Sequence, residues 1–260
     1  MKTKTLCIIQ ARTGSTRFPR KVLKKVAGKT LLEHCISRVT QVASIDKIVV
    51  ATTTHKRDDV LALLCKRIKI SCVRGSETDL LDRYYRCSLA YPEYNTIVRI
   101  TSDCPIVDPK VAESVIAIFY EKKLDYACNI DPETFPDGMD VEVFTKKALI
   151  EAAQKATLPS EREHMTQYIR KQKKFKKGNV SASHNWAHFR MTVDEPEDFD
   201  VIKFLLTHTT HDASYMDYIV LLSKNPDIML KNMYITRNSG LLKSLQEDEK
   251  QKSKSKSQKK

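Results

Sequence analysis

The residues best suited to chemistry stand near the start of the chain, in the stretch IIQARTGSTRFPRKVL at positions 8–23. A short apolar run leads into the cations Arg12, Arg17, Arg20 and Lys21, which alternate with small and hydroxyl residues. A strand that ends in such a loop presents backbone N–H groups to an anion, and Arg or Lys then neutralises it. The stretch therefore indicates a phosphate-binding loop, although a basic, solvent-exposed loop explains the charge run equally well.

The spacing of this loop excludes two common phosphate motifs. Only Gly14 precedes Lys21, so the G-x-x-x-x-G-K-[ST] pattern of P-loop NTPases is absent, and so is G-x-G-x-x-G. If this loop binds a phosphate, it does so in a site of neither of these two types.

Two aspartates follow strand-like runs and can hold a cation. Asp103 ends TIVRITSD and Asp194 ends FRMTVD, at the carboxyl edge of a sheet, where open α/β folds bind ligands. Mg²⁺ commonly takes one or two carboxylates together with substrate phosphates. The alternative is that each aspartate caps the helix that follows it.

Further polar groups gather in the second half of the chain. Alternation in PDGMDVEVF (136–144) places Asp140 and Glu142 on one face of a strand, where they could bind sugar hydroxyls or a second metal, or simply meet solvent. Arg162 and His164 stand at the start of an expected helix and would suit an anionic substituent of a sugar. These four residues are the predicted substrate-binding group.

Alternating strand and helix patterns must position these residues. Strands are expected at 5–11, 47–53, 70–74, 96–102, 125–130, 140–144 and 188–193, and in the second half helices at 146–157, 161–172, 197–207 and 213–223. Capping boxes are expected at Thr30–Glu33 and Ser160–Glu163, and prolines after Asp108 and Glu195 mark further helix starts. The pattern predicts an α/β fold, a mostly parallel mixed sheet flanked by helices.

No linker divides the chain, so we expect one domain over residues 1–246. Residues 1–130 would form a nucleotide-binding half, and residues 131–246 would bind the acceptor and mediate dimerisation. Residues 247–260, EDEKQKSKSKSQKK, are expected to be a disordered Lys-rich tail.

Composition narrows the class of function. The formal net charge is +13, and the tail, with six lysines and three acids, supplies +3 of it. A basic surface is compatible with RNA binding, but no aromatic platform or helix-turn-helix pattern accompanies it, so we expect small acidic substrates and no nucleic acid.

Seven scattered cysteines without a C-x-x-C pair indicate free thiols. Neither a signal-peptide pattern nor a membrane-length apolar run is present, so a cytoplasmic protein is expected.

Several motifs in order resemble the sugar cytidylyltransferases. The stretch QARTGSTRFPRKVLKKVAGKTLLEHCISRV is similar to their N-terminal signature, and the similarity continues through VRGSETDLLDRYY, VRITSDCPIVDP, PDGMDVEVF, EREHMTQYI, FRMTVDEPEDFDVI and ITRNSGLLKSL. The closest resemblance is to the SpsF type, named for spore-coat polysaccharide synthesis, and the KDO and sialic-acid CMP-sugar synthetases are related. One departure is Arg20, where the family usually has glycine.

The resemblance implies a GT-A-like, Rossmann-like nucleotidyltransferase fold and transfer of CMP from CTP to a sugar or sugar acid, with Mg²⁺ as cofactor and a homodimeric state. It implies catalytic roles for Arg12, Lys21 and Asp103, and metal binding by Asp103 and Asp194. The implied nucleotide-binding residues are Ala11, Arg12, Gly14, Ser15, Arg17, Lys21, Arg74, Gly75, Ser76 and Ser102. Arg74 would contact the cytosine base.

Two other functions remain open at this point. A GT-A glycosyltransferase with a nucleotide-sugar donor would share the fold, but such enzymes usually carry an Asp-x-Asp motif where this chain has SDCPIVDP. An RNA-binding protein is supported by net charge alone.

Overall fold

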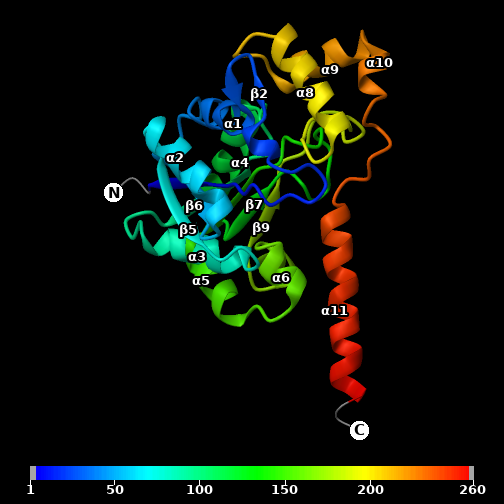
Figure 1. Cartoon of the computed structure of the whole chain (residues 1–260). Helices are drawn as coiled ribbons and strands as arrows, with labels where there is room; N and C mark the ends of the chain where they lie inside the picture. Colours follow the sequence, from blue (N-terminus) through cyan, green and yellow to red (C-terminus); the bar gives the residue numbers. More distant parts are fainter. Residues whose placement is uncertain (1–3, 258–260) are drawn as a thin grey trace.

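A seven-stranded mixed sheet forms the centre of the molecule (Figure 1). The computed structural model describes residues 4–257, with side chains up to residue 250. The strand order is β5-β4-β1-β6-β8-β7-β9, with β1 at Thr5–Gln10, β4 at Lys47–Thr53, β5 at Ser71–Gly75, β6 at Thr96–Thr101, β7 at Tyr126–Cys128, β8 at Glu142–Thr145 and β9 at Lys177–Asn179. Strand β8 runs antiparallel to both neighbours, and all other pairings are parallel.

Helices cover both faces of this sheet because its strands are apolar on both sides. In β1, Cys7 and Ile9 belong to one buried cluster, whereas Leu6 and Ile8 belong to the other. The first cluster includes α1 (Leu31–Val39), α2 (Asp59–Arg67) and α4 (Pro109–Glu121); the second includes α3 (Leu80–Leu89), α5 (Lys146–Lys155) and α7 (Gln167–Lys171). The expected α/β layers are confirmed.

Several helix starts follow the expected local chemistry. The Thr30 hydroxyl accepts from the Glu33 amide, and the Glu33 carboxylate accepts from the Thr30 amide. Asp108 caps α4, whose first residue is Pro109. These helices begin where the sequence predicts because each signal lies within one turn.

A third buried cluster lies beyond the sheet, at the top of Figure 1. It joins α8 (Pro196–His208), α9 (Tyr215–Ser223) and α10 (Pro226–Met229) to the segment 189–193. Short elements complete the chain: the hairpin β2 (Lys25–Val26) and β3 (Lys29–Thr30), and the 3₁₀ turns η1 (Lys21–Leu23) and η2 (Lys56–Asp58).

The strand expected at 188–193 is wrong: only an isolated bridge between Asp137 and Arg190 forms there. The backbone of this segment divides its hydrogen bonds between two partners. Met191 N donates to Asp137 O at 2.7 Å, whereas Val193 N donates to Asp103 O at 2.9 Å. Because no single strand runs alongside, no ladder continues.

The helix expected at 161–172 is broken into α6 (Pro159–Glu163) and α7. The capping box expected at Ser160 is also wrong, because α6 already begins at Pro159. The Ser160 hydroxyl instead donates to Asp248 at 2.6 Å. A contact distant in sequence has replaced the local cap.

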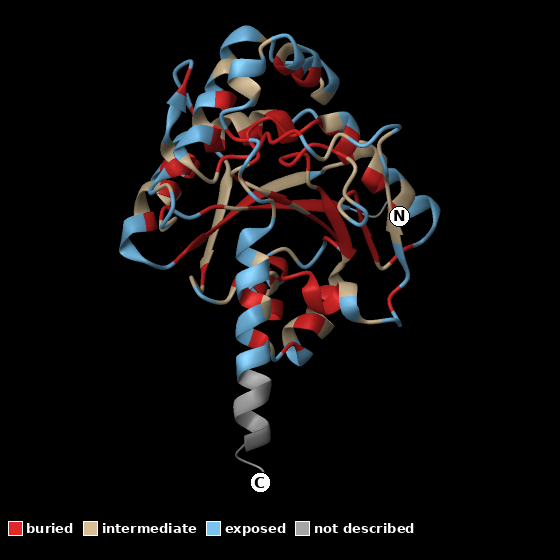
Figure 2. Cartoon of the chain, turned by 90° about the vertical axis from the view of Figure 1, so that its right-hand side faces the viewer, coloured by how far each residue is buried: buried red, intermediate tan, exposed pale blue. Residues whose placement is uncertain are grey.

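The chain ends in a long helix, α11 (Ser239–Ser257), that extends beyond the body of the molecule (Figure 1), and its side chains up to residue 250 are mostly exposed (Figure 2). The predicted disorder of the tail is therefore contradicted for residues 247–257, and residues 258–260 lie outside the described residues. Asp248 is buried, and its carboxylate accepts from both the amide and the hydroxyl of Ser160. The Lys-rich composition of residues 247–260 gives no sign of this buried contact.

Over residues 4–257, no helix is long and apolar enough to cross a membrane.

Candidate active site

A pocket of about 510 Å³ opens at the carboxyl edge of the parallel strands β1 and β6. Its wall contains ten of the residues that the sequence predicts: Ala11, Arg12, Gly14, Ser15, Arg17, Lys21, Ser102, Asp103, His164 and Asp194. Parallel strands that end side by side bring residues 11–21 and 102–103 together. The phosphate loop and the two aspartates therefore share one cavity.

A buried carboxylate holds the phosphate loop in place. Asp58, which is fully buried, accepts from the Thr13 amide at 2.8 Å and from the Thr13 hydroxyl at 2.6 Å. It also accepts from the Thr53 hydroxyl. Burial by itself would raise the pKa of Asp58, but these hydrogen bonds outweigh it and lower the pKa. The sequence analysis missed Asp58 because its role depends on a loop 45 positions away.

Lys21 lies between the two aspartates. Its Nζ is 3.0 Å from Asp103 Oδ2 and 2.7 Å from Asp194 Oδ1, and Arg17 Nη2 is 3.0 Å from Asp194 Oδ1. Burial alone would lower the pKa of Lys21, but the two carboxylates outweigh it and raise the pKa. Burial would raise the pKa of Asp194, yet the charges of Lys21, Arg17 and Arg190 lower it to about 2.

Backbone contacts explain why Asp103 and Asp194 meet although 91 positions separate them. Val193 N donates to Asp103 O, and the Thr192 hydroxyl donates to the same oxygen at 3.1 Å. Asp198, at the start of α8, accepts from the Asp194 amide at 2.8 Å. Both carboxylates are therefore fixed by the backbone on either side of Lys21.

This arrangement fits a divalent cation. Two carboxylate oxygens, from Asp103 and Asp194, lie within 3.0 Å of one nitrogen, so they already converge on a positive charge. Oxygen ligands of this number suit Mg²⁺, which completes its shell with phosphate oxygens and water. No group of three or more His, Cys, Asp or Glu side chains could hold a metal by itself among the described residues, so the substrate must supply ligands.

Arg74, Gly75 and Ser76 do not line this pocket. The Arg74 guanidinium points elsewhere: Nη1 is 2.6 Å from Asp59 Oδ1, and Nε donates to Thr53 O at 2.8 Å. The Ser76 hydroxyl accepts from the amide of Asp79 at 3.0 Å. The predicted contact of Arg74 with the base does not fit this geometry, because the side chain is engaged on the other side of β5.

Three of the four predicted substrate-binding residues also lie outside the pocket wall. Glu142 is buried and pairs with Arg99, and it accepts from the Tyr126 hydroxyl at 2.6 Å. Asp140 pairs with Arg237 at 2.6 Å. Each carboxylate neutralises an arginine from another element, which the alternation of PDGMDVEVF could not reveal.

Arg162 pairs with Asp79, and its Nη1 donates to Ala153 O at 2.9 Å. It therefore joins α6 to the start of α3 rather than facing a ligand. Of the four predicted residues, only His164 lines the pocket, with Nε2 at 3.1 Å from the Ser244 hydroxyl of α11. Burial lowers the pKa of His164 and favours its neutral form.

The pocket includes residues that the sequence analysis missed, among them Gln10, Arg83 and Arg99. Arg99 had a detectable signal, since it is the one charge within the apolar run TIVRIT of a central strand. Gln10 and Arg83 had no local signal that separates them from ordinary strand and helix positions.

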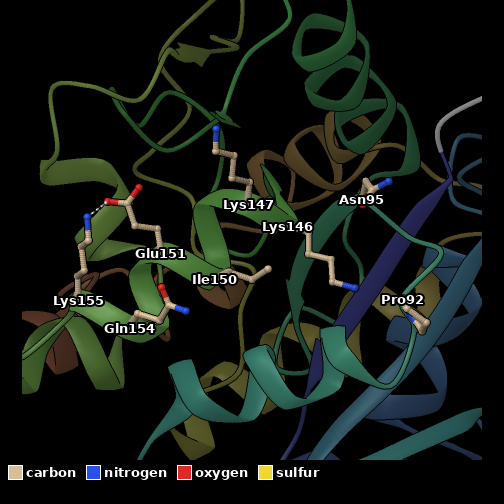
Figure 3. A pocket seen from close by; sticks show the side chains of 8 residues that line it. All are labelled: Pro92, Asn95, Lys146, Lys147, Ile150, Glu151, Gln154 and Lys155. Carbon is tan, nitrogen blue, oxygen red and sulfur yellow. Dashed lines mark hydrogen bonds and ion pairs between the residues drawn. The ribbon is translucent and has the colours of Figure 1, made fainter.

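A second hollow of about 590 Å³ lies at the opposite edge of the sheet (Figure 3). Its lining residues come from α5 and the segment before β6: Pro92, Asn95, Lys146, Lys147, Ile150, Glu151, Gln154 and Lys155. Its one carboxylate, Glu151, is already paired with Lys155 and Lys174. This hollow lacks the converging carboxylates of the first pocket, which remains the candidate site.

Comparison with known proteins places the chain in a family. The family model described as cytidylyltransferase matches residues 6–243. This protein belongs to the cytidylyltransferase family. The GT-A-like nucleotidyltransferase prediction is confirmed, and the glycosyltransferase and RNA-binding alternatives are set aside.

Relatives of this cytidylyltransferase agree with that assignment. The spore coat polysaccharide biosynthesis protein SpsF of Bacillus subtilis is 33% identical over 85% of this chain and 95% of its own. A cytidylyltransferase structure from Leptospira borgpetersenii serovar Hardjo-bovis has a TM-score of 0.84 and 32% identity, over 90% of this chain and all of its own. A CMP:2-keto-3-deoxy-manno-octonic acid synthetase complexed with CTP has a TM-score of 0.61 at 17% identity, over 79% and 99%, and supports the fold alone.

Proposed function

We propose that this cytidylyltransferase transfers CMP from CTP to a sugar or sugar acid and releases pyrophosphate. The observation that carries the proposal is Lys21 held between Asp103 and Asp194 in one pocket with the phosphate loop. Nucleotidyl transfer needs cations against the triphosphate and carboxylates for a metal, and the pocket offers both.

The chain's own residues would act by positioning and charge. Arg12 lines the pocket, is exposed and makes no ion pair with a described residue, so its guanidinium is available to a phosphate. Arg17 and Lys21 add cations that stabilise charge on the pyrophosphate leaving group. Asp103 and Asp194 would hold Mg²⁺, which when bound neutralises the triphosphate. No protein nucleophile is required, because the acceptor oxygen attacks the α-phosphorus in line.

The acceptor would be a sugar in surface polysaccharide or glycan synthesis. Support comes from the relative SpsF, which is named for spore coat polysaccharide biosynthesis. The arginines that suggested an anionic acceptor give no further support for it. Arg162 is neutralised by Asp79, and Arg190 by Asp137, Asp194 and Asp198.

Nucleotide titration tests the proposal. We expect Mg²⁺ with CTP to raise the melting temperature more than UTP, ATP or GTP, because a ligand of the folded state stabilises in proportion to its affinity. Asp103→Asn and Arg12→Ala should lose this response, whereas Asp200→Asn, at a side chain 56% exposed, should keep it. A response to UDP- or GDP-sugars but to no triphosphate would contradict the proposal, and so would no nucleotide response at all.

The metal is tested separately. With CTP and a panel of sugars and sugar acids, pyrophosphate release should stop in EDTA and return with Mg²⁺. Full activity in EDTA would contradict the proposed role of Asp103 and Asp194.

We further propose a homodimer that acts in the cytoplasm. Exposed apolar side chains on and after α9, among them Val220, Leu230 and Tyr234, are the residues that we expect a second copy of the chain to cover. All seven cysteines are free thiols, as a reducing compartment maintains them. Light scattering at micromolar concentration should give twice the chain mass, and Tyr234→Glu should reduce it to one.

A further inference from the structure

Arg83 is a buried cation whose side chain is only partly satisfied by the described residues, and it lines the nucleotide pocket. It lies on α3, lines the pocket and is only 3% exposed. Its Nε and Nη1 find no hydrogen-bond partner among the described residues. Buried polar groups are nearly always paired, and an unpaired charge is costly. A ligand group in the pocket would remove that cost.

The Arg83 side chain is held in position by its surroundings. A Cβ at Gly75 would come within 3.2–3.3 Å of the Cα, Cβ and Cγ atoms of Arg83, so the glycine lets this stem pack closely against β5. The next residue, Tyr84, donates to Ile8 O at 3.1 Å and to Gln10 Oε1 at 3.2 Å, which ties α3 to the end of β1. The guanidinium is therefore preorganised, which lowers the entropic cost of binding.

No nearby carboxylate is available to Arg83. Asp58 is bonded to Thr13 and Thr53, and Glu77 pairs with Arg57. Burial, with a contribution from the charge of Arg12, lowers the pKa of Arg83. Arg12 and Arg83 thus line one cavity, and a substrate group in that cavity is the acceptor left for Arg83.

The neighbours of Arg83 in the pocket wall favour an acceptor on the base rather than on the phosphates. The carboxylates that would hold the metal, Asp103 and Asp194, follow β6 and precede α8, and Lys21 lies between them. The α3 wall adds Thr78 and the apolar side chain of Leu80 next to Arg83. An apolar surface beside a hydrogen-bond donor suits a flat ring whose edge carries acceptors.

We propose that Arg83 donates a hydrogen bond to the O2 carbonyl of the pyrimidine base and so takes the role that the sequence assigned to Arg74. The inference rests on the proposed function, since it concerns the same CTP. Arginine has donors only, so it selects an edge that accepts. Arg83 is thus a base-recognition residue, and the cations Arg12, Arg17 and Lys21 bind the phosphates.

Calorimetric titration with CTP and with 2-thio-CTP, in which sulfur replaces O2, tests this assignment. The wild-type protein with Mg²⁺ should bind CTP about 10-fold or more tightly than 2-thio-CTP, because sulfur is a poor acceptor. Arg83→Met should weaken CTP binding about 10- to 100-fold, the effect of one hydrogen bond to a charged group. The variant should also lose the preference for CTP over 2-thio-CTP.

Arg86→Met is the matched control, because Arg86 is on the same helix and its side chain is 65% exposed. It should bind both nucleotides as the wild type does. The comparison of CTP with 2-thio-CTP on the wild-type protein needs no variant. It therefore tests the contact with O2 even if Arg83→Met does not fold.

Three results would overturn the assignment. Equal binding of CTP and 2-thio-CTP by the wild type would exclude the O2 contact, and so would wild-type affinity for CTP in Arg83→Met. A loss of affinity for inorganic triphosphate as large as that for CTP would make Arg83 a phosphate ligand. If the wild-type protein binds no CTP, the proposed function itself fails, which is a different outcome from these three.

Discussion

Arg20 adopts a backbone conformation that glycine prefers, with φ 58° and ψ 23°. The sequence resembles cytidylyltransferases that usually have glycine at this position. For a residue with a Cβ, the left-handed conformation costs about 1 kcal/mol. The Arg20 amide donates to Thr13 O at 3.1 Å, so the loop itself imposes this conformation. The departure noticed in the sequence is therefore a site of backbone strain.

We expect Arg20→Gly to raise the free energy of unfolding by about 1 kcal/mol, because glycine relieves this strain. Urea denaturation measures the change. Lys24→Gly is the control, since Lys24 has an ordinary extended backbone with φ −62° and should lose stability when glycine replaces it. Equal effects of the two variants would show that Arg20 is not strained.

Asp194 gives a prediction about pH. Its pKa of about 2 in the folded protein lies below the ordinary aspartate value of 3.8, so ionised Asp194 stabilises the fold above about pH 4. This contribution, about 2 kcal/mol, is lost as the pH falls through 2. In EDTA, the stability difference between wild type and Asp194→Asn should therefore shrink by about 2 kcal/mol from pH 5 to pH 2. A difference that does not change with pH would contradict the charge pairing with Lys21.

At the scale of single residues, the sequence predicts that residues 11–21 and the two aspartates lie together at one edge of the sheet, and they line one pocket there. Arg12 and Asp103 come two positions after the ends of β1 and β6, so their position at the sheet edge follows from local pattern, and Lys21 stands in the loop that continues from β1. Arg74 also follows a strand, yet Asp59 and backbone carbonyls turn it away. Which way a long side chain points depends on neighbours that no local pattern contains.

Helix α11 is an element whose position depends on one buried contact. The Asp248 carboxylate accepts from the amide and the hydroxyl of Ser160, at 3.0 and 2.6 Å, and so joins α11 to α6. His164 and Ser244 add a second link near the pocket. The helix thereby contributes Gly240 to the pocket wall.

Asp248→Ala should lower the free energy of unfolding by about 1–3 kcal/mol, because it leaves a buried amide and a hydroxyl without an acceptor. Hydrogen exchange should show faster exchange in α6 and in the first turns of α11. Glu247→Ala, at an exposed neighbouring position, is the control and should leave exchange unchanged. Unaltered protection of α6 in Asp248→Ala would mean that α11 does not support it.

The elements that the sequence predicts wrongly share a physical cause. The segment 188–193 has a strand-like apolar pattern, but its amides bond to two different segments. Residues 161–172 have helical spacing, but Ser160 is bonded to α11 and the helix breaks at His164. In contrast, α1 and α4 begin at caps that lie within the helix sequence itself. Elements with local signals are predictable, and those fixed by distant partners are not.

At the scale of the whole molecule, the two halves of the chain share one sheet. Strand β8, from the second half, lies between β6 and β7, and Val98 pairs with Val143 in its antiparallel register with β6. Arg190 adds a buried charge contact within the second half that holds Asp194 in the pocket. Neither the sheet nor the site is complete without both halves.

The two halves should therefore unfold in one cooperative transition. The chain has one tryptophan, Trp186, in the second half, where it packs against the third buried cluster. Its fluorescence reports on that half, whereas far-UV circular dichroism reports on all helices and strands. Because removing β8 from the sheet would expose the edges of β6 and β7 together, both signals should give the same urea midpoint and the same slope. A fluorescence transition that precedes the loss of circular dichroism would mean that residues 131–246 form a separate folding unit, which would contradict the prediction.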